Sequence, residues 1–287
     1  MSQSSVLDAV KVGSVFHPSD FSEASEIAFV HALKIALVAK AKLTVLHVNA
    51  SPNTKWQDFP GVRQTLERWK LLPKGSPRSA VGRLGIDVEK VMAASKSPVK
   101  ASLAFLERHS ADLIVLAIHQ HNGHMRWLEK SVGTPIARCA GQMTLFIPHG
   151  VAGFISREEG ALSLRNILIP VARKPRPQPS VEAATRVIRN LELPAGTITL
   201  LHVGSTSDAP SLHLPEFKGW TWDRQAHAGE PAQTILQIAN ASRADLIVMT
   251  TDGRDGFLDG LRGSTSERVL RKVRCPVLCL PTGSLLG

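Results

Sequence analysis

Hydrophobic residues along this chain alternate between short unbroken runs and a helical spacing. Runs such as Leu113–Ile118 are typical of strands that are covered on both faces, and they are far shorter than the ~20 residues that cross a bilayer. Between positions 21 and 40, apolar residues instead recur every three or four positions, which predicts a helix. Buried strands that alternate with helices indicate an α/β fold, in which right-handed crossovers make the parallel sheet doubly wound.

The same succession of elements is predicted twice. Expected strands are 14–17, 43–48, 86–92, 112–117 and 144–147, then 166–170, 197–203, 221–226, 245–249 and 277–280. Expected helices are 21–40, 98–110 and 131–140, then 180–190, 231–242 and 264–273. Ligands of doubly wound folds bind beyond the carboxyl ends of the strands, where the strand order reverses, so the loops there are the first place to seek a site.

An internal repeat accounts for this symmetry. Ala111–Val115 recurs letter for letter as Ala244–Val248, and Thr44-Val-Leu-His-Val48 recurs as Thr199-Leu-Leu-His-Val203. Four matching blocks in the same order indicate a duplicated domain, with a boundary where proline, glycine and charge interrupt the pattern. The expected domains are residues 1–150 and 151–287.

Composition narrows the class of protein. Of the 287 residues, 43% are hydrophobic and 20% are charged, which excludes a disordered or fibrous chain. Three cysteines are too few for a disulfide framework, and the N-terminus lacks a basic start followed by an apolar core. We therefore expect a cytoplasmic protein without a signal peptide or a membrane partner.

The net charge of +10 attracts anions of any kind, including nucleotides and nucleic acid. Aromatic residues make up only 5% of the chain and tyrosine is absent, so no base-stacking platform stands out. Nucleic acid is therefore not an expected partner, and charge alone selects no ligand.

One glycine loop offers a specific chemistry. Gly253 permits a tight turn directly after a predicted strand, and Gly263 stands where the next helix begins. Unpaired backbone N–H groups at a helix start bind phosphates, and three hydroxyls follow there: Ser264, Thr265 and Ser266. The alternative is an ordinary helix cap after a surface loop.

This loop, the Leu-His-Val strand ends and the Pro-x-Asp after the first strand resemble the universal stress protein family, over nearly the whole chain and as two tandem copies. In that family the loop after the fourth strand reads Gly, two residues, Gly, nine residues, Gly, then Ser or Thr, and binds the ribose and phosphates of ATP. The second copy matches with Thr250, Gly253, Gly263 and Ser264, and only the first glycine is replaced. The first copy has Ala117, Gln120, Lys130 and Ser131 at these positions, so its loop is degenerate.

The family's other contact is an aspartate after the first strand, near the adenine and ribose. The first copy keeps it as Asp20, whereas the second has Ala172, and losing that carboxylate costs roughly 1–3 kcal/mol. The resemblance implies ATP or another adenine nucleotide, with or without Mg²⁺, mainly in the second copy. Its expected contacts are Pro170, Val171, Val203, Thr250, Gly253, Gly263, Ser264, Thr265 and Ser266. The first copy offers Asp20, Val48 and Ser131 as weaker candidates.

The resemblance also implies a stress-response protein that acts as a sensor or survival factor. The final strands of the two copies are expected to pair across a pseudo-twofold axis, and a further homodimer stays open. We name no catalytic residue and expect at most slow ATP hydrolysis, because Asp252 and Asp255 are the only carboxylates near the loop. The alternatives are an enzyme that acts on nucleotides and a scaffold that engages proteins through its basic surface and the insertion at 49–85.

Other residues receive structural interpretations. His119, His121 and His124, with His17 nearby, lack further ligands at metal-binding spacing, so we expect solvated side chains and no metal. The equivalent His47 and His202 are expected to pack or hydrogen-bond, and Cys275 and Cys279 to be buried. The basic, proline-rich loop 173–179 is either an exposed loop or a cover over the ligand, and its prolines prevent a helix until about Ser180. Within the insertion, Leu66 and Trp69 predict a short amphipathic helix against its own domain.

Overall fold

The computed structural model describes residues 12–49, 55–118, 142–251 and 264–281. The strands are β1 (Ser14–Pro18), β2 (Lys42–Asn49), β3 (Asp87–Ala94), β4 (Leu113–Ile118), β5 (Met143–Pro148), β6 (Asn166–Val171), β7 (Gly196–Val203), β8 (Trp220–His227), β9 (Leu246–Thr251) and β10 (Val277–Pro281). The helices are α1 (Glu23–Ala39), α2 (Val62–Arg68), α3 (Pro98–Arg108), α6 (Gln178–Asn190), α7 (Pro231–Ala241) and α8 (Thr265–Leu270). Short 3-10 turns lie at η1 (Trp56–Asp58), η2 (Arg78–Ala80), η3 (Gly82–Leu84) and η4 (Thr206–Asp208).

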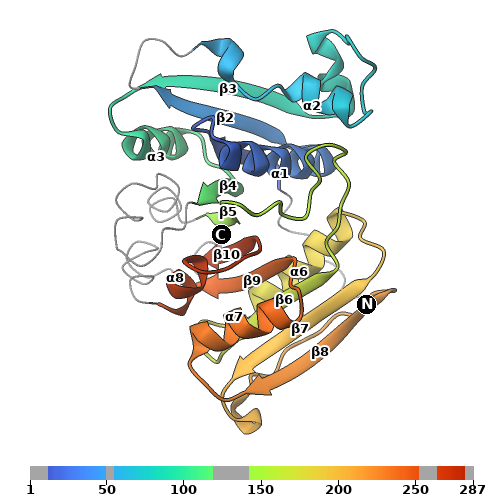
Figure 1. Ribbon diagram of the computed structural model, residues 1–287, viewed down its shortest axis with the longest axis vertical. Helices are drawn as coiled ribbons and strands as arrows, with labels where there is room; N and C mark the ends of the chain where they lie inside the picture. Colours follow the sequence, from blue (N-terminus) through green and yellow to red (C-terminus); the bar gives the residue numbers. More distant parts are fainter. Residues whose placement is uncertain (1–11, 50–54, 119–141, 252–263, 282–287) are drawn as a thin grey trace, which may run out of the picture.

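All of these strands belong to one sheet, in the order β3-β2-β1-β4-β5-β10-β9-β6-β7-β8 (Figure 1). Each copy contributes five strands in the same order, read from the edge to the centre. Neighbouring strands within a copy are parallel, and β5 and β10 meet antiparallel. Leu145 faces its repeat equivalent Leu278 there, so the pseudo-twofold axis passes between them. The predicted fold class and the predicted pairing of the final strands are confirmed.

The alternation of side chains along the strands builds two core layers. Odd-numbered positions of β4, such as Leu113 and Val115, pack with α1 and α6 in one hydrophobic cluster. Even-numbered positions such as Ile114 and Leu116 pack in a second cluster, which includes residues of α3, α7 and α8. Helices therefore cover both faces of the sheet, as the doubly wound prediction requires.

Several predicted boundaries differ from the observed ones. Helix α1 begins at Glu23 instead of residue 21, because Ser22 caps it and accepts a hydrogen bond from the Ser25 N–H. Helix α6 begins at Gln178, slightly before the expected start near Ser180. A proline in the first helical turn needs no N–H partner, so the prolines there do not delay the helix. The predicted helix 131–140 lies outside the described residues.

The insertion of the first copy packs against its own domain, as predicted. Its short helix α2 buries Leu66, and Trp69 follows as the C-cap with only 6% of its surface exposed. The Trp69 indole donates a hydrogen bond to the Arg157 carbonyl at 3.0 Å, which ties the segment between the two copies to the first copy. The division of the chain at residue 150 stays a prediction.

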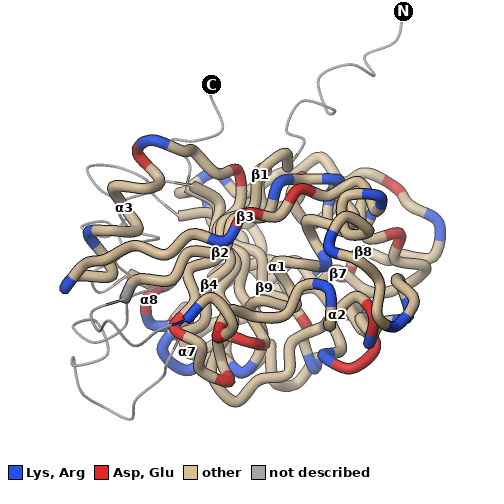
Figure 2. Tube along the Cα trace, turned by 90° about the horizontal axis from the view of Figure 1, so that it is seen from above, with Lys and Arg blue, Asp and Glu red and all other residues tan. Residues whose placement is uncertain are grey.

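Charged residues are spread over the molecule instead of forming one stripe. In the view of Figure 2, blue and red segments alternate around the described part of the chain. None of the helices in that part is long and apolar enough to cross a bilayer.

Candidate functional site

A cavity of about 300 Å³ lies in the second copy, where β6, β7 and β9 end. Strands β6 and β9 pair with each other, while their onward connections run to opposite sides, so this is the point where the strand order reverses. The cavity is lined by Pro170, Val171, Ala172, Lys174, Pro175, Leu201, Val203, Pro231, Ile235, Met249, Thr250, Thr265 and Ser266.

Six of the predicted contact residues come together here. They arrive from the ends of three strands and from the first turn of α8: Pro170, Val171, Val203, Thr250, Thr265 and Ser266. Ser264 does not line the cavity; its hydroxyl caps α8 by accepting a hydrogen bond from the Glu267 N–H at 3.2 Å. Gly253 and Gly263 lie outside the described residues, as do Gln120, Lys130, Ser131, Asp252 and Asp255.

The cavity combines apolar walls with hydroxyls. Val171, Leu201 and Ile235 are buried apolar side chains, whereas Thr250 and Ser266 are buried hydroxyl groups, each 7% exposed. Neither hydroxyl has a hydrogen-bond partner among the described residues. Both residues line the cavity, so their hydroxyls are available to hydrogen-bond a polar ligand there.

The basic loop after β6 contributes to the site. Lys174 and Pro175 line the cavity, so the loop covers part of it instead of pointing wholly into solvent. Arg173 turns away and pairs with Asp208 at 3.2 Å, with both side chains mostly exposed. Lys174 is therefore a basic residue that lines the cavity, while its neighbour Arg173 does not line it.

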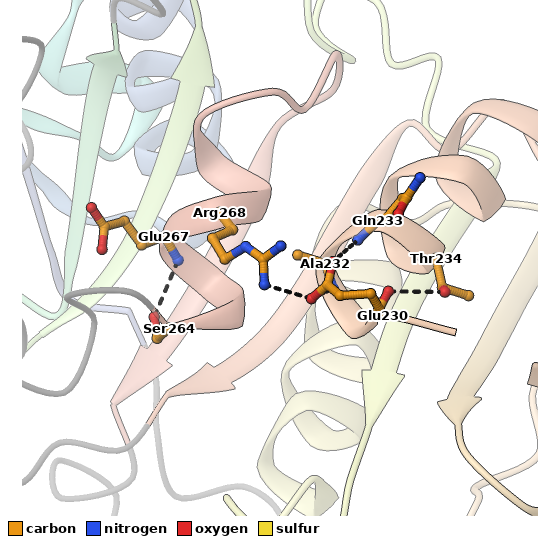
Figure 3. A network of polar contacts seen from close by, with 7 residues as sticks. All are labelled: Glu230, Ala232, Gln233, Thr234, Ser264, Glu267 and Arg268. Carbon is orange, nitrogen blue, oxygen red and sulfur yellow. Dashed lines mark hydrogen bonds and ion pairs between the residues drawn. The ribbon is translucent and has the colours of Figure 1, made fainter. Parts of the chain in front are cut away.

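A polar network fixes the two helices that wall the cavity (Figure 3). Glu230 caps α7 by accepting hydrogen bonds from the backbone N–H groups of Ala232 and Gln233, at 3.1 and 2.9 Å. Its carboxylate also receives the Arg268 guanidinium of α8 at 2.6 Å. The hydrogen bond from the Gln233 N–H is the main reason why the pKa of Glu230 lies below its ordinary value.

Our sequence reasoning missed Glu230 and Arg268. The available signal was a carboxylate directly before Pro231, which is a good first residue of a helix. The Glu230 partner across the site, on α8, is visible only in three dimensions. The ion pair between Glu230 and Arg268 therefore links the start of α7 to α8 beside the cavity.

The two equivalent histidines have the structural role that we predicted. In the first copy, the His47 Nδ1 lies 2.7 Å from the Ser19 carbonyl oxygen, and in the second the His202 Nδ1 lies 3.1 Å from the Val171 carbonyl oxygen. The His47 ring thus donates to the backbone just beyond the end of β1, and the His202 ring donates to the last residue of β6. This contact holds the second strand of each copy against the first, next to the predicted ligand edge.

Aromatic side chains cover the corresponding edge of the first copy. The Phe21 ring stacks on His47, with centroids 3.9 Å apart, and meets the Phe59 ring of the insertion edge-on at 5.2 Å. Asp20 is exposed, and its carboxylate accepts hydrogen bonds from the Ser22 N–H and hydroxyl, at 3.0 and 2.6 Å. The aspartate that the first copy retains is thus part of the turn into α1, beside a stacked ring that follows it in sequence.

His17, at the end of β1, is a buried and hydrogen-bonded side chain. The ring is fully buried, with Nδ1 2.9 Å from the Val115 carbonyl oxygen and Nε2 3.4 Å from the Ser25 hydroxyl. Burial lowers the pKa of His17 to about 4. His119, His121 and His124 lie outside the described residues, and no group of three metal-binding side chains gathers within the described ranges.

The two described cysteines are packed as small apolar side chains, as predicted. Cys275 is 6% exposed and Cys279 is fully buried. Burial raises the pKa of both thiols to about 12, so neither is poised as a thiolate.

Comparison with known proteins identifies the family to which this architecture corresponds. The model of the Universal stress protein family matches residues 14–148 and 218–281, which is more than half of the chain. A universal stress protein of Methanocaldococcus jannaschii is 48% identical over 50 residues, which are 17% of this chain and 29% of that protein. One of Thermus aquaticus is 46% identical over 50 residues, which are 17% of this chain and 36% of that protein. The matched segment thus spans about a third of these curated relatives.

Two solved structures match the chain over nearly its full length, and a third matches about half of it. A universal stress protein of Archaeoglobus fulgidus DSM 4304 has a TM-score of 0.59 at 17% identity, covering 93% of this chain and 95% of that one. A functionally unknown protein of Pseudomonas aeruginosa PAO1 also scores 0.59, at 15% identity, covering 96% and 94%. A universal stress protein in complex with cAMP covers 48% of this chain and 98% of its own, at 20% identity and a TM-score of 0.33. At 17% and 15% identity, the likeness of the two full-length matches concerns the fold.

Proposed function

The chain belongs to the universal stress protein family as a tandem, two-domain member, and from that premise we propose that its second copy binds an adenine nucleotide. The observation that carries the proposal is the cavity at the carboxyl ends of β6, β7 and β9, which gathers six of the residues at the family's contact positions. We further propose that binding ATP, ADP or AMP makes the protein a sensor or survival factor under stress.

The cavity has the chemistry that a nucleotide needs. Its volume of about 300 Å³ falls at the lower end of the range for small-molecule sites. Val171, Val203 and Ile235 offer apolar contact to a base, and the hydroxyls of Thr250 and Ser266 offer hydrogen bonds to a ribose or phosphate. Lys174 at the cavity favours an anionic ligand.

The loop that carries Gly253 and Gly263 would complete the phosphate end of the site, by the family resemblance. In that arrangement Pro170, Val171 and Val203 border the adenine, and bound Mg²⁺ would neutralise phosphate charge. Ala172 lines the cavity without a carboxylate, so we expect micromolar to millimolar affinity in place of tight binding.

The first test fills the cavity and uses the repeat as its own control. Val203 lines the cavity at the end of β7, and Val48 is its repeat equivalent near the end of β2; both are half-buried. Val203→Trp should abolish the heat of ATP binding in titration calorimetry, whereas Val48→Trp should retain it. The reverse result would place the nucleotide in the first copy, and circular dichroism would verify that both variants fold.

A second test restores the missing family contact. Ala172→Asp places a carboxylate at the cavity, where the family has its aspartate, and should raise the affinity for AMP about tenfold or more. AMP is the appropriate probe because it carries less phosphate charge to repel the new carboxylate than ATP does. An unchanged or weaker affinity would show that the adenine and ribose do not lie beside residue 172.

One observation favours a scaffold as the second candidate function. Trp56 of the insertion is 60% exposed and stacks on Phe59, with ring centroids 5.4 Å apart. Both line a surface groove of about 990 Å³ together with the cationic side chains of Arg78 and Lys90. If calorimetry shows no heat with ATP, ADP and AMP, this partner-binding interpretation replaces the nucleotide proposal.

A further inference from the structure

A second cavity, of about 350 Å³, lies on the pseudo-twofold axis between α1 and α6. It is bordered by Leu113, Met143 and Leu246, which are the first residues of β4, β5 and β9. The nucleotide cavity lies instead at the carboxyl ends of strands in the second copy. The two cavities share no lining residue, so each can be tested without the other.

The walls of this junction cavity are apolar and nearly symmetric. Repeat-equivalent side chains face each other across the axis: Ile35 with Val187, Ala39 with Leu191, Leu113 with Leu246, and Leu145 with Leu278. Phe154, from the segment between the copies, closes a further side. Its backbone N–H donates to the His31 Nε2 at 3.2 Å, which fixes that segment on α1. An apolar cavity of this kind gains little from water and binds apolar groups.

The polar groups of the cavity, in contrast, are not symmetric. Arg186 of α6 is half-buried and makes no ion pair with any described residue. Its repeat equivalent, Lys34, lies over the Trp69 ring at 5.8 Å and does not line the cavity. The cavity therefore carries a cation from one copy only.

The acidic residue at the cavity does not neutralise this cation by an ion pair. The Asp112 Oδ2 accepts hydrogen bonds from the backbone N–H groups of Gly13 and Ser14, both at 2.8 Å. The Gln142 side chain presents a buried Oε1 that has no hydrogen-bond partner among the described residues. Within the part of the chain that the structure describes, the Arg186 guanidinium thus has no carboxylate partner and the Gln142 Oε1 has no hydrogen-bond partner, and both residues line an apolar cavity.

We propose that the junction cavity binds an amphipathic monocarboxylate of medium chain length. The apolar tail lies along Ile35, Val187 and Leu278, and the carboxylate pairs with the Arg186 guanidinium, whose planar fork matches a carboxylate. The Gln142 amide, whose two ends can exchange, supplies a further hydrogen bond to the head group. A neutral hydrocarbon would leave both polar groups unused, and a polyphosphate would find no place among the apolar walls.

The experiment titrates dodecanoate into the full-length protein at concentrations where the fatty acid is monomeric. Affinity should rise about fourfold per methylene group from octanoate through decanoate to dodecanoate, because each added group is buried. Dodecanol should bind about tenfold more weakly than dodecanoate or worse, since it cannot pair with a guanidinium. Absence of binding, or equal affinity for the acid and the alcohol, overturns the proposal.

Two variants separate the head-group contact from the apolar chamber. Arg186→Gln should lower the affinity for dodecanoate about tenfold or more and leave that for dodecanol unchanged. Val187→Trp should abolish binding of both, while ATP binding persists because the nucleotide cavity is elsewhere. If that variant does not fold, Ile35→Phe fills the same chamber from α1. If the affinity for dodecanoate is unchanged in all of these variants, the junction cavity is not its binding site. That result would leave the nucleotide proposal unaffected.

Discussion

The free energy of unfolding of this protein should fall already in mildly acidic solution, because two of its histidines are buried in the neutral form. The His31 ring is fully buried; its Nδ1 lies 2.8 Å from the Ile27 carbonyl oxygen, and its Nε2 accepts the Phe154 N–H at 3.2 Å. Protonation would turn Nε2 into a donor that faces another donor. Burial lowers the pKa of His31 from the ordinary value of 6.5 to about 4, and it lowers that of His17 equally.

The sign follows from proton linkage. Because the folded pKa is depressed for a base, the unfolded chain binds protons first, and the free energy of unfolding falls as the pH drops below about 6.5. The loss continues until the pH reaches about 4, where the folded rings also protonate. At pH 5 each histidine costs about 2 kcal/mol relative to neutral pH, so His17 and His31 together cost about 4 kcal/mol. That is a large part of the ~5–15 kcal/mol by which a typical domain is stable.

Urea unfolding at pH 7, 6 and 5, followed by tryptophan fluorescence and circular dichroism, measures this loss. In the variants His31→Gln and His17→Gln the substituted side chain cannot titrate, so each variant should lose about 2 kcal/mol less than the wild type between pH 7 and 5. Each should also be less stable than the wild type at pH 7, because the hydrogen bonds of the imidazole are lost. Their double variant should be almost independent of pH in this window if the two sites add. A wild-type free energy of unfolding that is flat from pH 7 to 5, or a double variant that keeps the wild-type slope, would refute the reasoning.

Three further predictions concern packing and backbone. Gly153→Ala should lose about 1–3 kcal/mol in urea unfolding, because the residue has φ +72° and an added Cβ would lie 2.3 Å from the His31 Nε2; full stability would contradict the described backbone. Cys275 and Cys279 should resist iodoacetamide in the native state, with a pKa near 12, and react after urea denaturation; peptide mass spectrometry showing native labelling would disprove their burial. Asp112→Ala should cost about 2 kcal/mol, since its carboxylate accepts two backbone N–H bonds at 2.8 Å; a melting temperature within a degree of wild type would mean that water replaces them.

Much of the fold could be predicted from near neighbours in the chain. Runs such as Leu113–Ile118 identify buried strands, and the Ala111–Val115 repeat predicts the second domain-like copy. Boundaries were less accurate, because they depend on single capping contacts and on the position of each proline within the helical turn. Pro179 stands in the first turn of α6, where its missing N–H costs nothing, so the helix begins slightly before the expected start near Ser180.

The candidate nucleotide site was predictable where the family pattern specified single residues. Thr250, Val203 and Ser266 are distant in sequence, and the structure brings them to one cavity. The covering of the first copy by Phe21 and Phe59 could not be foreseen, since the two rings are separated by a strand and part of an insertion. The periodicity of hydrophobic residues along the chain does not predict a contact between such distant rings.

Local periodicity and repeated blocks suffice to predict the strands and helices, the duplication and the residue types at each strand end. Only the packed structure shows that an apolar chamber lies between α1 and α6 where Leu145 meets Leu278, and that Lys174 and Pro175 line the cavity of the second copy. Cavities and buried charges arise from the packing of side chains that are far apart in the chain, and no local pattern contains that packing. Arg186 and Lys34 occupy equivalent positions, but Trp69 lies beneath only one of them.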